Sequence, residues 1–242
     1  MNLRHALALA AWLFGAGLAQ AAPNCALPAA ADLRPGKDIA PDTDANRCLR
    51  RIVDRRPDYY MLVLSWSPGF CDGIRRRNGG SLPAGLDFQC GGRNRFGWIV
   101  HGLWGQSLAP DDCTTERGDR QPLHPRWCGG DLPPLPPTTF AGFMCTQPGA
   151  DLLQGEWEKH GACGFADATA YFTKTKALYN ALVLPDAPLR PPEIFRWMRE
   201  TNPALRGVRM GWSGGSGELQ VCYSTAWKPI DCPDAGRRQS RR

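Results

Sequence analysis

Residues 59–66 read YYMLVLSW, a nearly continuous apolar run that is followed by Ser67-Pro68-Gly69. A short apolar run that is rich in β-forming residues and bounded by turn residues is typical of a strand covered on both faces. The sequence therefore predicts a buried central strand over these eight positions. The rest of the chain is expected to pack around it.

A second strand is predicted over residues 96–101 (FGWIVH), after a glycine- and arginine-rich stretch at 72–95 that is expected to be a loop. His101 ends this strand directly before a glycine-containing segment, which is expected to turn. A histidine at such a position is often only a hydrogen-bonded core residue. The chain has few histidines, however, and both His101 and His160 lie in aromatic-flanked segments. Two such rings are also what a proton relay requires.

The stretch at residues 155–164 reads GEWEKHGACG. In a helix, Glu156, Lys159 and His160 stand at i, i+3 and i+4 and share one face. An acid, a cation and a titratable ring on one face suit general acid/base chemistry on an anionic substrate. The same spacing also fits a solvated helix edge with one ion pair, and the spacing alone does not decide between them.

The N-terminal residues 1–21 are predicted to be a secretory signal peptide. Arg4 and His5 precede an apolar run, and Ala19-Gln20-Ala21 fits the small-x-small cleavage rule. No later apolar run is long enough to predict a membrane span. We therefore expect an exported protein, periplasmic or secreted, that does not associate with membranes.

In an exported protein, an even number of cysteines indicates disulfide bonds, because disulfides persist in oxidising compartments. A metal site is the alternative, but no Cys-x-x-Cys or His-x-x-x-His spacing supports one. We expect up to five disulfides and no metal. The ten cysteines are Cys25, Cys48, Cys71, Cys90, Cys113, Cys128, Cys145, Cys163, Cys222 and Cys232.

The charge of the chain is modestly positive, with 29 Lys and Arg against 23 Asp and Glu. Most of the basic residues are arginines, which suit phosphate because the planar guanidinium binds pairs of oxygens. A solvated basic surface explains any single cluster equally well. Length and the lack of repeats predict one main domain, preceded by an arm at 22–57 with a short helix around 45–53 and followed by a basic tail at 234–242.

Two motifs carry a resemblance to a known family: His101-Gly102-Leu103-Trp104 and the segment from Glu156 to Cys163. Together they resemble the ribonuclease T(2) family, the base-nonspecific acid ribonucleases. YMLVLSWSPGFC at 60–71 resembles the first core strand of that family, and LQVCYSTAWKPIDCP at 219–233 resembles its C-terminal hairpin. The resemblance covers most of residues 58–233.

The resemblance implies an α+β fold in which a central antiparallel sheet is flanked by helices and stabilised by disulfides. The spacing of apolar residues predicts helices over 167–184 and 192–201, and residues 113–137 are expected to be a proline-rich loop. In that setting Cys222 is expected to pair with Cys232. Cys163 is expected to tie its helix to the loop through Cys113 or Cys128.

The resemblance also implies the chemistry. RNA carries its own nucleophile, the 2′-hydroxyl, so two histidines suffice as base and acid and no cofactor is needed. His160 is expected to be the base and His101 the acid, with Lys159 and Glu156 stabilising the phosphorane and Trp104 stacking on a base. The alternative for Trp104 is a buried ring that props His101. DNA lacks the 2′-hydroxyl, so at most it binds without being cleaved. The protein is expected to act as a monomer.

Two positions depart from the family pattern. Gly155 stands where family members usually carry a phosphate-binding histidine, and Gly105-Gln106 replaces a pair that usually begins with proline. His124 or a nearby arginine is a candidate to compensate for Gly155, but the sequence places neither there. The missing histidine is the one argument for an alternative function: a weakened family member that serves as an RNA-binding or interaction module.

Overall fold

The computed structural model describes residues 25–29, 33–36, 48, 50–115 and 117–233. The predicted signal peptide, the predicted basic tail and much of the arm lie outside the described residues. Of the short helix expected over 45–53, the described positions are not helical. Val53 instead forms an isolated antiparallel bridge with Arg126.

The predicted central strand is β1 (Tyr59–Trp66), which pairs with β2 (Trp98–Gln106) on one side and β6 (Glu218–Ser224) on the other. The antiparallel order is β2-β1-β6-β5, with β5 at Gly211–Ser213 and β7 (Pro229–Ile230) pairing with β6. Leu62, Val63 and Leu64 of β1 are fully buried, as the continuous apolar run predicts. The expected α+β fold with a central antiparallel sheet is confirmed.

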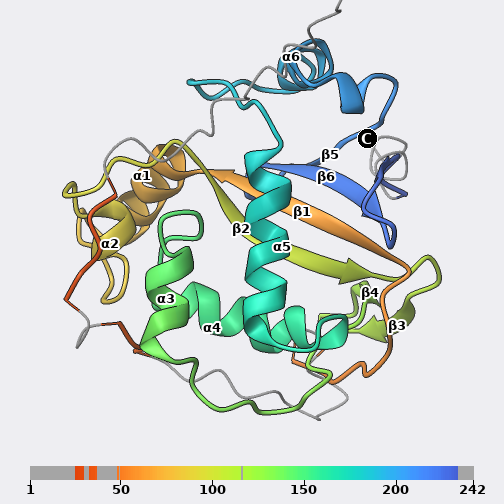
Figure 1. The fold of residues 1–242 in the computed structure, drawn as a ribbon, viewed down its shortest axis with the longest axis horizontal. Helices are drawn as coiled ribbons and strands as arrows, with labels where there is room; N and C mark the ends of the chain where they lie inside the picture. The colour runs from red at the N-terminus through yellow and green to blue at the C-terminus, as the bar shows by residue number, and fades with distance from the viewer. Residues whose placement is uncertain (1–24, 30–32, 37–47, 49, 116, 234–242) are drawn as a thin grey trace, which may run out of the picture.

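Helices cover the sheet and close the main core. In Figure 1, α5 (Ala168–Asn180) crosses in front of β1 and β2, and α4 (Ala150–Lys159) also packs on β2. Tyr171 and Phe172 of α5 and Leu153 of α4 are buried in this core. The remaining helices are α1 (Ser67–Arg77), α2 (Asp87–Cys90), α3 (Pro137–Phe143) and α6 (Glu193–Thr201), with single 3₁₀ turns at Gly161–Cys163 and Pro203–Leu205.

The second strand is longer than predicted. It does not turn after His101 but continues to Gln106, with Gly102 and Gly105 inside it. A Cβ on Gly105 would lie 2.4 Å from Pro57 Cγ, so this glycine permits close packing rather than a turn. The amide of Gln106 is buried and donates to its neighbour's carbonyl oxygen.

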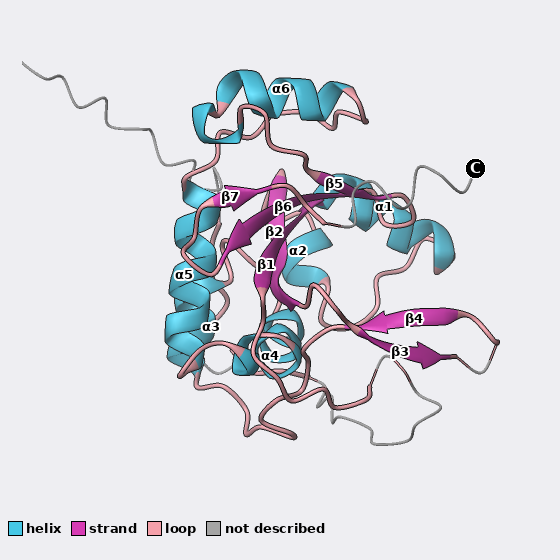
Figure 2. Cartoon of the chain, turned by 90° about the vertical axis from the view of Figure 1, so that its right-hand side faces the viewer, coloured by secondary structure: helices cyan, strands magenta, loops and turns pink. Residues whose placement is uncertain are grey.

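The two segments expected to be loops contain regular structure. Residues 72–95 hold the second half of α1 and all of α2, and basic side chains in the last turn of α1 complement the helix dipole. Residues 113–137 hold most of a hairpin, β3 (Asp111–Thr114) with β4 (Arg120–Leu123), which projects from the molecule in Figure 2. Few residues of α1, β3 and β4 are buried, so these elements lack the apolar periodicity on which prediction depends.

All ten cysteines are paired, so the disulfide framework expected from an even count is present. The structure pairs Cys222 with Cys232. It pairs Cys163 with Cys128, which decides between the two partners left open by the sequence. The other bridges are Cys25–Cys145, Cys48–Cys113 and Cys71–Cys90.

Candidate active site

A β-bulge in β2 sets the direction of the His101 side chain. Val63 pairs with Gly102 and Leu64 pairs with Val100, so His101 is the extra residue that has no partner on β1. Bulges of this kind re-aim a side chain relative to the regular pleat. The Gln147 amide donates to the carbonyl oxygen of His101 at 2.9 Å and fixes the backbone there.

The imidazole of His101 lies between two carboxylates. Its Nδ1–H donates to Glu218 Oε1 at 2.6 Å, and its Nε2 lies 3.6 Å from Glu156 Oε1. Burial acts to lower the pKa of His101, but the hydrogen bond to Glu218 and the two negative charges outweigh it and raise the pKa above the ordinary value. His101 is therefore held in its protonated form to a higher pH than a free histidine.

Glu218 is a site residue that the sequence did not indicate. It is the first residue of β6, and its carboxylate also accepts a hydrogen bond from Ser216 Oγ at 2.5 Å. Burial acts to raise its pKa, but the bond to His101 brings the pKa below the ordinary value. No spacing rule links a strand residue to a histidine 117 positions away, so only the folded chain reveals this pair.

Glu156 joins α4 to β2. Its Oε2 accepts a hydrogen bond from Trp104 Nε1 at 2.8 Å, and its side chain is buried. A Cβ on Gly102 would lie 1.7 Å from Glu156 Oε2, so the approach needs glycine at that position. Burial raises the pKa of Glu156, although His101 and Lys159 act in the opposite direction. The carboxyl group of Glu156 therefore keeps its proton to a higher pH than that of a free glutamate.

His160 is the C-cap of α4, directly after Lys159. Trp104 stacks on it with ring centroids 5.3 Å apart, and the edge of the same indole meets His101 at 5.2 Å. Burial lowers the pKa of His160 well below the ordinary value, and the charge of Lys159 lowers it further. Burial also lowers the pKa of Lys159. His101 thus keeps its proton to a higher pH than a free histidine, and His160 loses its proton at a lower pH.

The structure therefore brings together all five residues that the sequence singled out: His101, Trp104, Glu156, Lys159 and His160. Tyr171 of α5 braces them, since its hydroxyl bonds the backbone N–H and C=O of Leu103 at 3.1 and 3.2 Å. Glu156, Lys159 and His160, at the end of α4, lie close to His101 of β2. A helix edge with one ion pair does not describe this arrangement.

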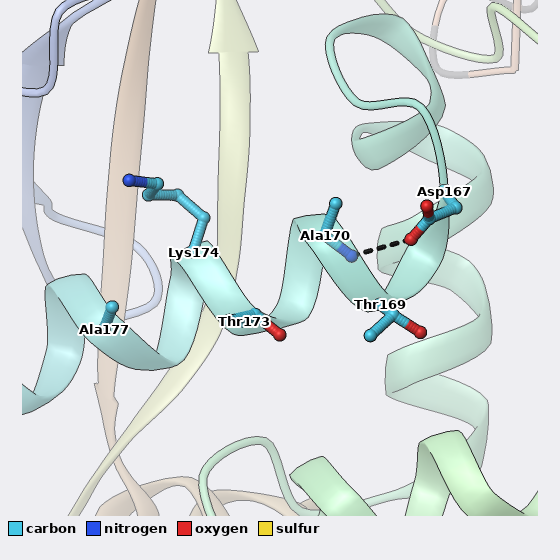
Figure 3. Close-up of a pocket in the computed structure, with 6 residues that line it drawn as sticks. All are labelled: Asp167, Thr169, Ala170, Thr173, Lys174 and Ala177. Carbon is cyan, nitrogen blue, oxygen red and sulfur yellow. Dashed lines mark hydrogen bonds between the residues drawn. The ribbon is translucent and has the colours of Figure 1, made fainter.

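Other features of the described residues do not add to this group. A hollow on the outer face of α5, drawn in Figure 3, holds one capping bond, from the Ala170 N–H to Asp167 Oδ1 at 2.8 Å. It contains no histidine or cysteine. Within the described part of the chain, no group of His, Cys, Asp and Glu is arranged to hold a metal ion. No helix described in the structure is long and apolar enough to cross a bilayer.

Comparison with known proteins identifies the family of the chain. A sequence model described as "Ribonuclease T2 family" matches residues 57–190, which hold both histidine motifs. The chain belongs to the ribonuclease T2 family. In this T2 chain the family model matches the segment that contains His101. Glu218, which bonds His101, lies outside that segment.

Two relatives of this T2 chain are named as ribonucleases. A protein of Haemophilus influenzae, "Probable ribonuclease", is 46% identical over 175 residues, which cover 72% of this chain and 61% of that protein. A "Ribonuclease" of Aeromonas hydrophila is 36% identical over 108 residues, or 44% of this chain and 37% of the relative. The chain thus spans about three fifths of the first relative's length and less of the second's.

Two solved structures, one of a ribonuclease and one of an RNase-related protein, also align with the chain. An RNase-related protein from Calystegia sepium aligns with a TM-score of 0.49 and 20% identity, over 74% of this chain and 92% of that one. Trichomaglin, described as a novel S-like ribonuclease, aligns with a TM-score of 0.48 and 19% identity, over 73% and 92%.

Proposed function

We propose that this T2 chain is an endoribonuclease that cleaves single-stranded RNA with low base specificity and without a metal. The observation that carries the proposal is the contrast between the pKa values of two histidines that both pack against Trp104. Glu218 raises the pKa of His101, and burial lowers the pKa of His160. An acid that keeps its proton and a base that stays free of one are what a single transphosphorylation step needs.

In the first step, His160 accepts the proton of the 2′-hydroxyl as that oxygen bonds to phosphorus. The bond from phosphorus to the 5′-oxygen breaks, and His101 gives its proton to the departing oxygen. The products are a 2′,3′-cyclic phosphate and a 5′-hydroxyl. In the slower second step the roles reverse: His101 activates a water molecule, His160 protonates the 2′-oxygen, and a 3′-phosphate remains.

Lys159 and Glu156 stabilise the negative charge that builds on the phosphorane oxygens. Lys159 supplies a partly buried cation, and the raised pKa of Glu156 lets its carboxyl donate a hydrogen bond. Trp104 takes a base on the face of its indole that is turned away from His160. Stacking of this kind contributes about 1–3 kcal/mol per base and accepts any base.

The predicted signal peptide and the five disulfides support export to the periplasm or the medium. Neither a membrane nor a second copy of the chain is required by the site, and we propose that the protein acts as a monomer.

The test uses purified protein, mixed RNA and excess chelator. We expect cyclic-phosphate ends to appear first and 3′-phosphates later, as read by mass spectrometry. His101→Ala and His160→Ala should each lower the rate at least about a thousandfold while circular dichroism is unchanged. Loss of cleavage in chelator would contradict metal independence. No cleavage under any condition would favour a binding module instead.

A further inference from the structure

The backbone of residues 124–128 is held against the C-terminal end of α4. The Trp127 N–H donates to the Lys159 carbonyl oxygen at 3.0 Å. The next residue, Cys128, forms the disulfide with Cys163, just beyond His160. A segment far away in the sequence is therefore fixed beside the cation and the imidazole of the site.

Arg126 is a buried cation in this segment. Its backbone is clamped by Val53 through hydrogen bonds of 2.9 and 3.1 Å, so its position does not depend on the side chain. The guanidinium is buried, with the residue 8% exposed, and Nε donates to the His124 carbonyl oxygen at 3.2 Å. Among the described residues, no carboxylate forms an ion pair with it.

An unpaired buried cation is costly, because burial removes water without supplying a counter-charge. Burial lowers the pKa of Arg126 for this reason. Some other arginines do form ion pairs: Arg55 lies 3.6 Å from Asp111, and Arg209 lies 2.9 Å from Asp231. A guanidinium that is held in place and left without a carboxylate is suited to an anion that comes from outside the chain.

The charges around the two histidines are unequal. His101 faces Glu156 and Glu218, whereas His160 feels the positive charges of Lys159 and Arg126. Arg126 and Lys159 also act on each other, since Arg126 contributes to the lowered pKa of Lys159. Glu156 acts on Lys159 with the opposite charge, whereas no carboxylate among the described residues forms an ion pair with Arg126.

We propose that Arg126 binds the non-bridging oxygens of the scissile phosphate, beside Lys159 and His160. The inference rests on the proposed ribonuclease function and extends it to one further residue. The planar fork of the guanidinium matches a pair of phosphoryl oxygens. It thereby supplies a phosphate ligand in a family member that has Gly155 where a histidine is usual.

The experiment compares Arg126→Met, Arg126→Lys and the control Arg55→Met on a dinucleoside monophosphate, which has only one phosphate. The Arg55 guanidinium is already bonded to Ser107, Ala109 and Asp111, so we expect its variant to cleave within about threefold of wild type. Arg126→Met should lower kcat about a hundredfold or more, and Arg126→Lys should recover part of it.

A phosphorothioate separates contact with phosphate from support of the fold. Wild type should cleave one sulfur diastereomer much more slowly than the other, and Arg126→Met should lose that discrimination. A purely structural role would lower the rate but leave the discrimination intact, and that result would overturn the proposal. The proposal would also be overturned if Arg126→Met cleaved the dinucleotide at a rate within threefold of wild type. A loss of rate seen only with longer RNA would likewise overturn it, because Arg126 would then contact a flanking phosphate.

Binding of inorganic phosphate, followed by calorimetry in a phosphate-free buffer, requires no turnover. We expect the affinity to fall at least tenfold in Arg126→Met and to be unchanged in Arg55→Met. If the wild-type protein cleaves no RNA but binds phosphate, and Arg126→Met no longer binds phosphate, the ribonuclease proposal fails and the anion site stands. If wild type cleaves RNA and phosphate binding does not depend on Arg126, the anion site alone fails.

Discussion

Glu218 sets the pH to which His101 keeps its proton, because its carboxylate accepts the hydrogen bond from Nδ1. With His101 as the proposed acid, we expect activity to persist to a higher pH than it would with an unperturbed histidine. The lowered pKa of His160 lets this proposed base stay neutral to a lower pH than a free histidine. Together these shifts favour a cleavage rate that stays high at mildly acidic pH and declines only at a pH above the ordinary pKa of histidine.

Glu218→Gln should therefore move the basic limb of the pH–rate profile to lower pH, since it removes the negative charge that raises the pKa of His101. The acidic limb, which belongs to His160, should stay in place. Ser216→Ala is the matched control, because it removes a hydrogen bond to Glu218 but keeps the charge. A basic limb that does not move in Glu218→Gln would show that His101 is not the acid.

Gly102 is required by the close contact between β2 and α4. A Cβ at this position would lie 1.7 Å from Glu156 Oε2 and 2.5 Å from Trp104 Nε1. We expect Gly102→Ala to push the carboxylate away, to lower kcat at least about tenfold and to cost about 1–3 kcal/mol of stability. In Gly142→Ala the new methyl meets no atom within 4 Å, so both readouts should stay near wild type. Unchanged kcat in Gly102→Ala would contradict the role of Glu156.

At the scale of elements, the Cys128–Cys163 disulfide joins the segment that carries Arg126 to the end of α4. Its two cysteines are 35 residues apart, so removing both by mutation to alanine should cost about 4 kcal/mol of stability. We also expect kcat to fall, because His160 and Arg126 lose a shared anchor. Chemical denaturation and dinucleotide cleavage measure the two effects.

The Cys71–Cys90 disulfide provides the comparison, because it joins α1 and α2, which hold none of the proposed site residues. Its separation of 19 residues predicts a loss of about 3 kcal/mol when both cysteines are replaced. Under conditions where both double variants remain folded, only the Cys128–Cys163 variant should lose kcat. Equal losses of kcat would mean that the effect is general destabilisation.

The sequence predicted the elements that bury a regular apolar pattern. β1 is fully buried over its centre, and α5 and α6 each place apolar residues on one face, so all three were expected within a few positions. The exposed α1 and the β3–β4 hairpin lack such a pattern and were expected to be loops. The bulge at His101 depends on pairing with β1, which no local pattern encodes.

At the scale of the whole molecule, the site is made by three elements that the chain order keeps apart. β2 supplies His101 and Trp104, α4 supplies Glu156 and Lys159 with His160 at its end, and β6 supplies Glu218. The sequence indicated the residues that lie within its two motifs. It did not indicate Glu218 or assign Arg126, because their roles depend on contacts between distant segments.

The substrate offers the last test, because the proposed chemistry needs a 2′-hydroxyl next to the broken bond. A DNA strand with a single ribonucleotide should be cut only at the phosphate that follows the ribose, and it should leave a 2′,3′-cyclic end. The same strand with a 2′-O-methyl group at that position should resist cleavage. The methylated strand should still compete with RNA for binding, because the positive net charge of +6 attracts its phosphates. Stacking of its bases on Trp104 does not involve the sugar. Mass spectrometry of the fragments reads every cut site at once. Cleavage at any deoxynucleotide would rule out attack by the neighbouring 2′-oxygen and would require a water nucleophile instead.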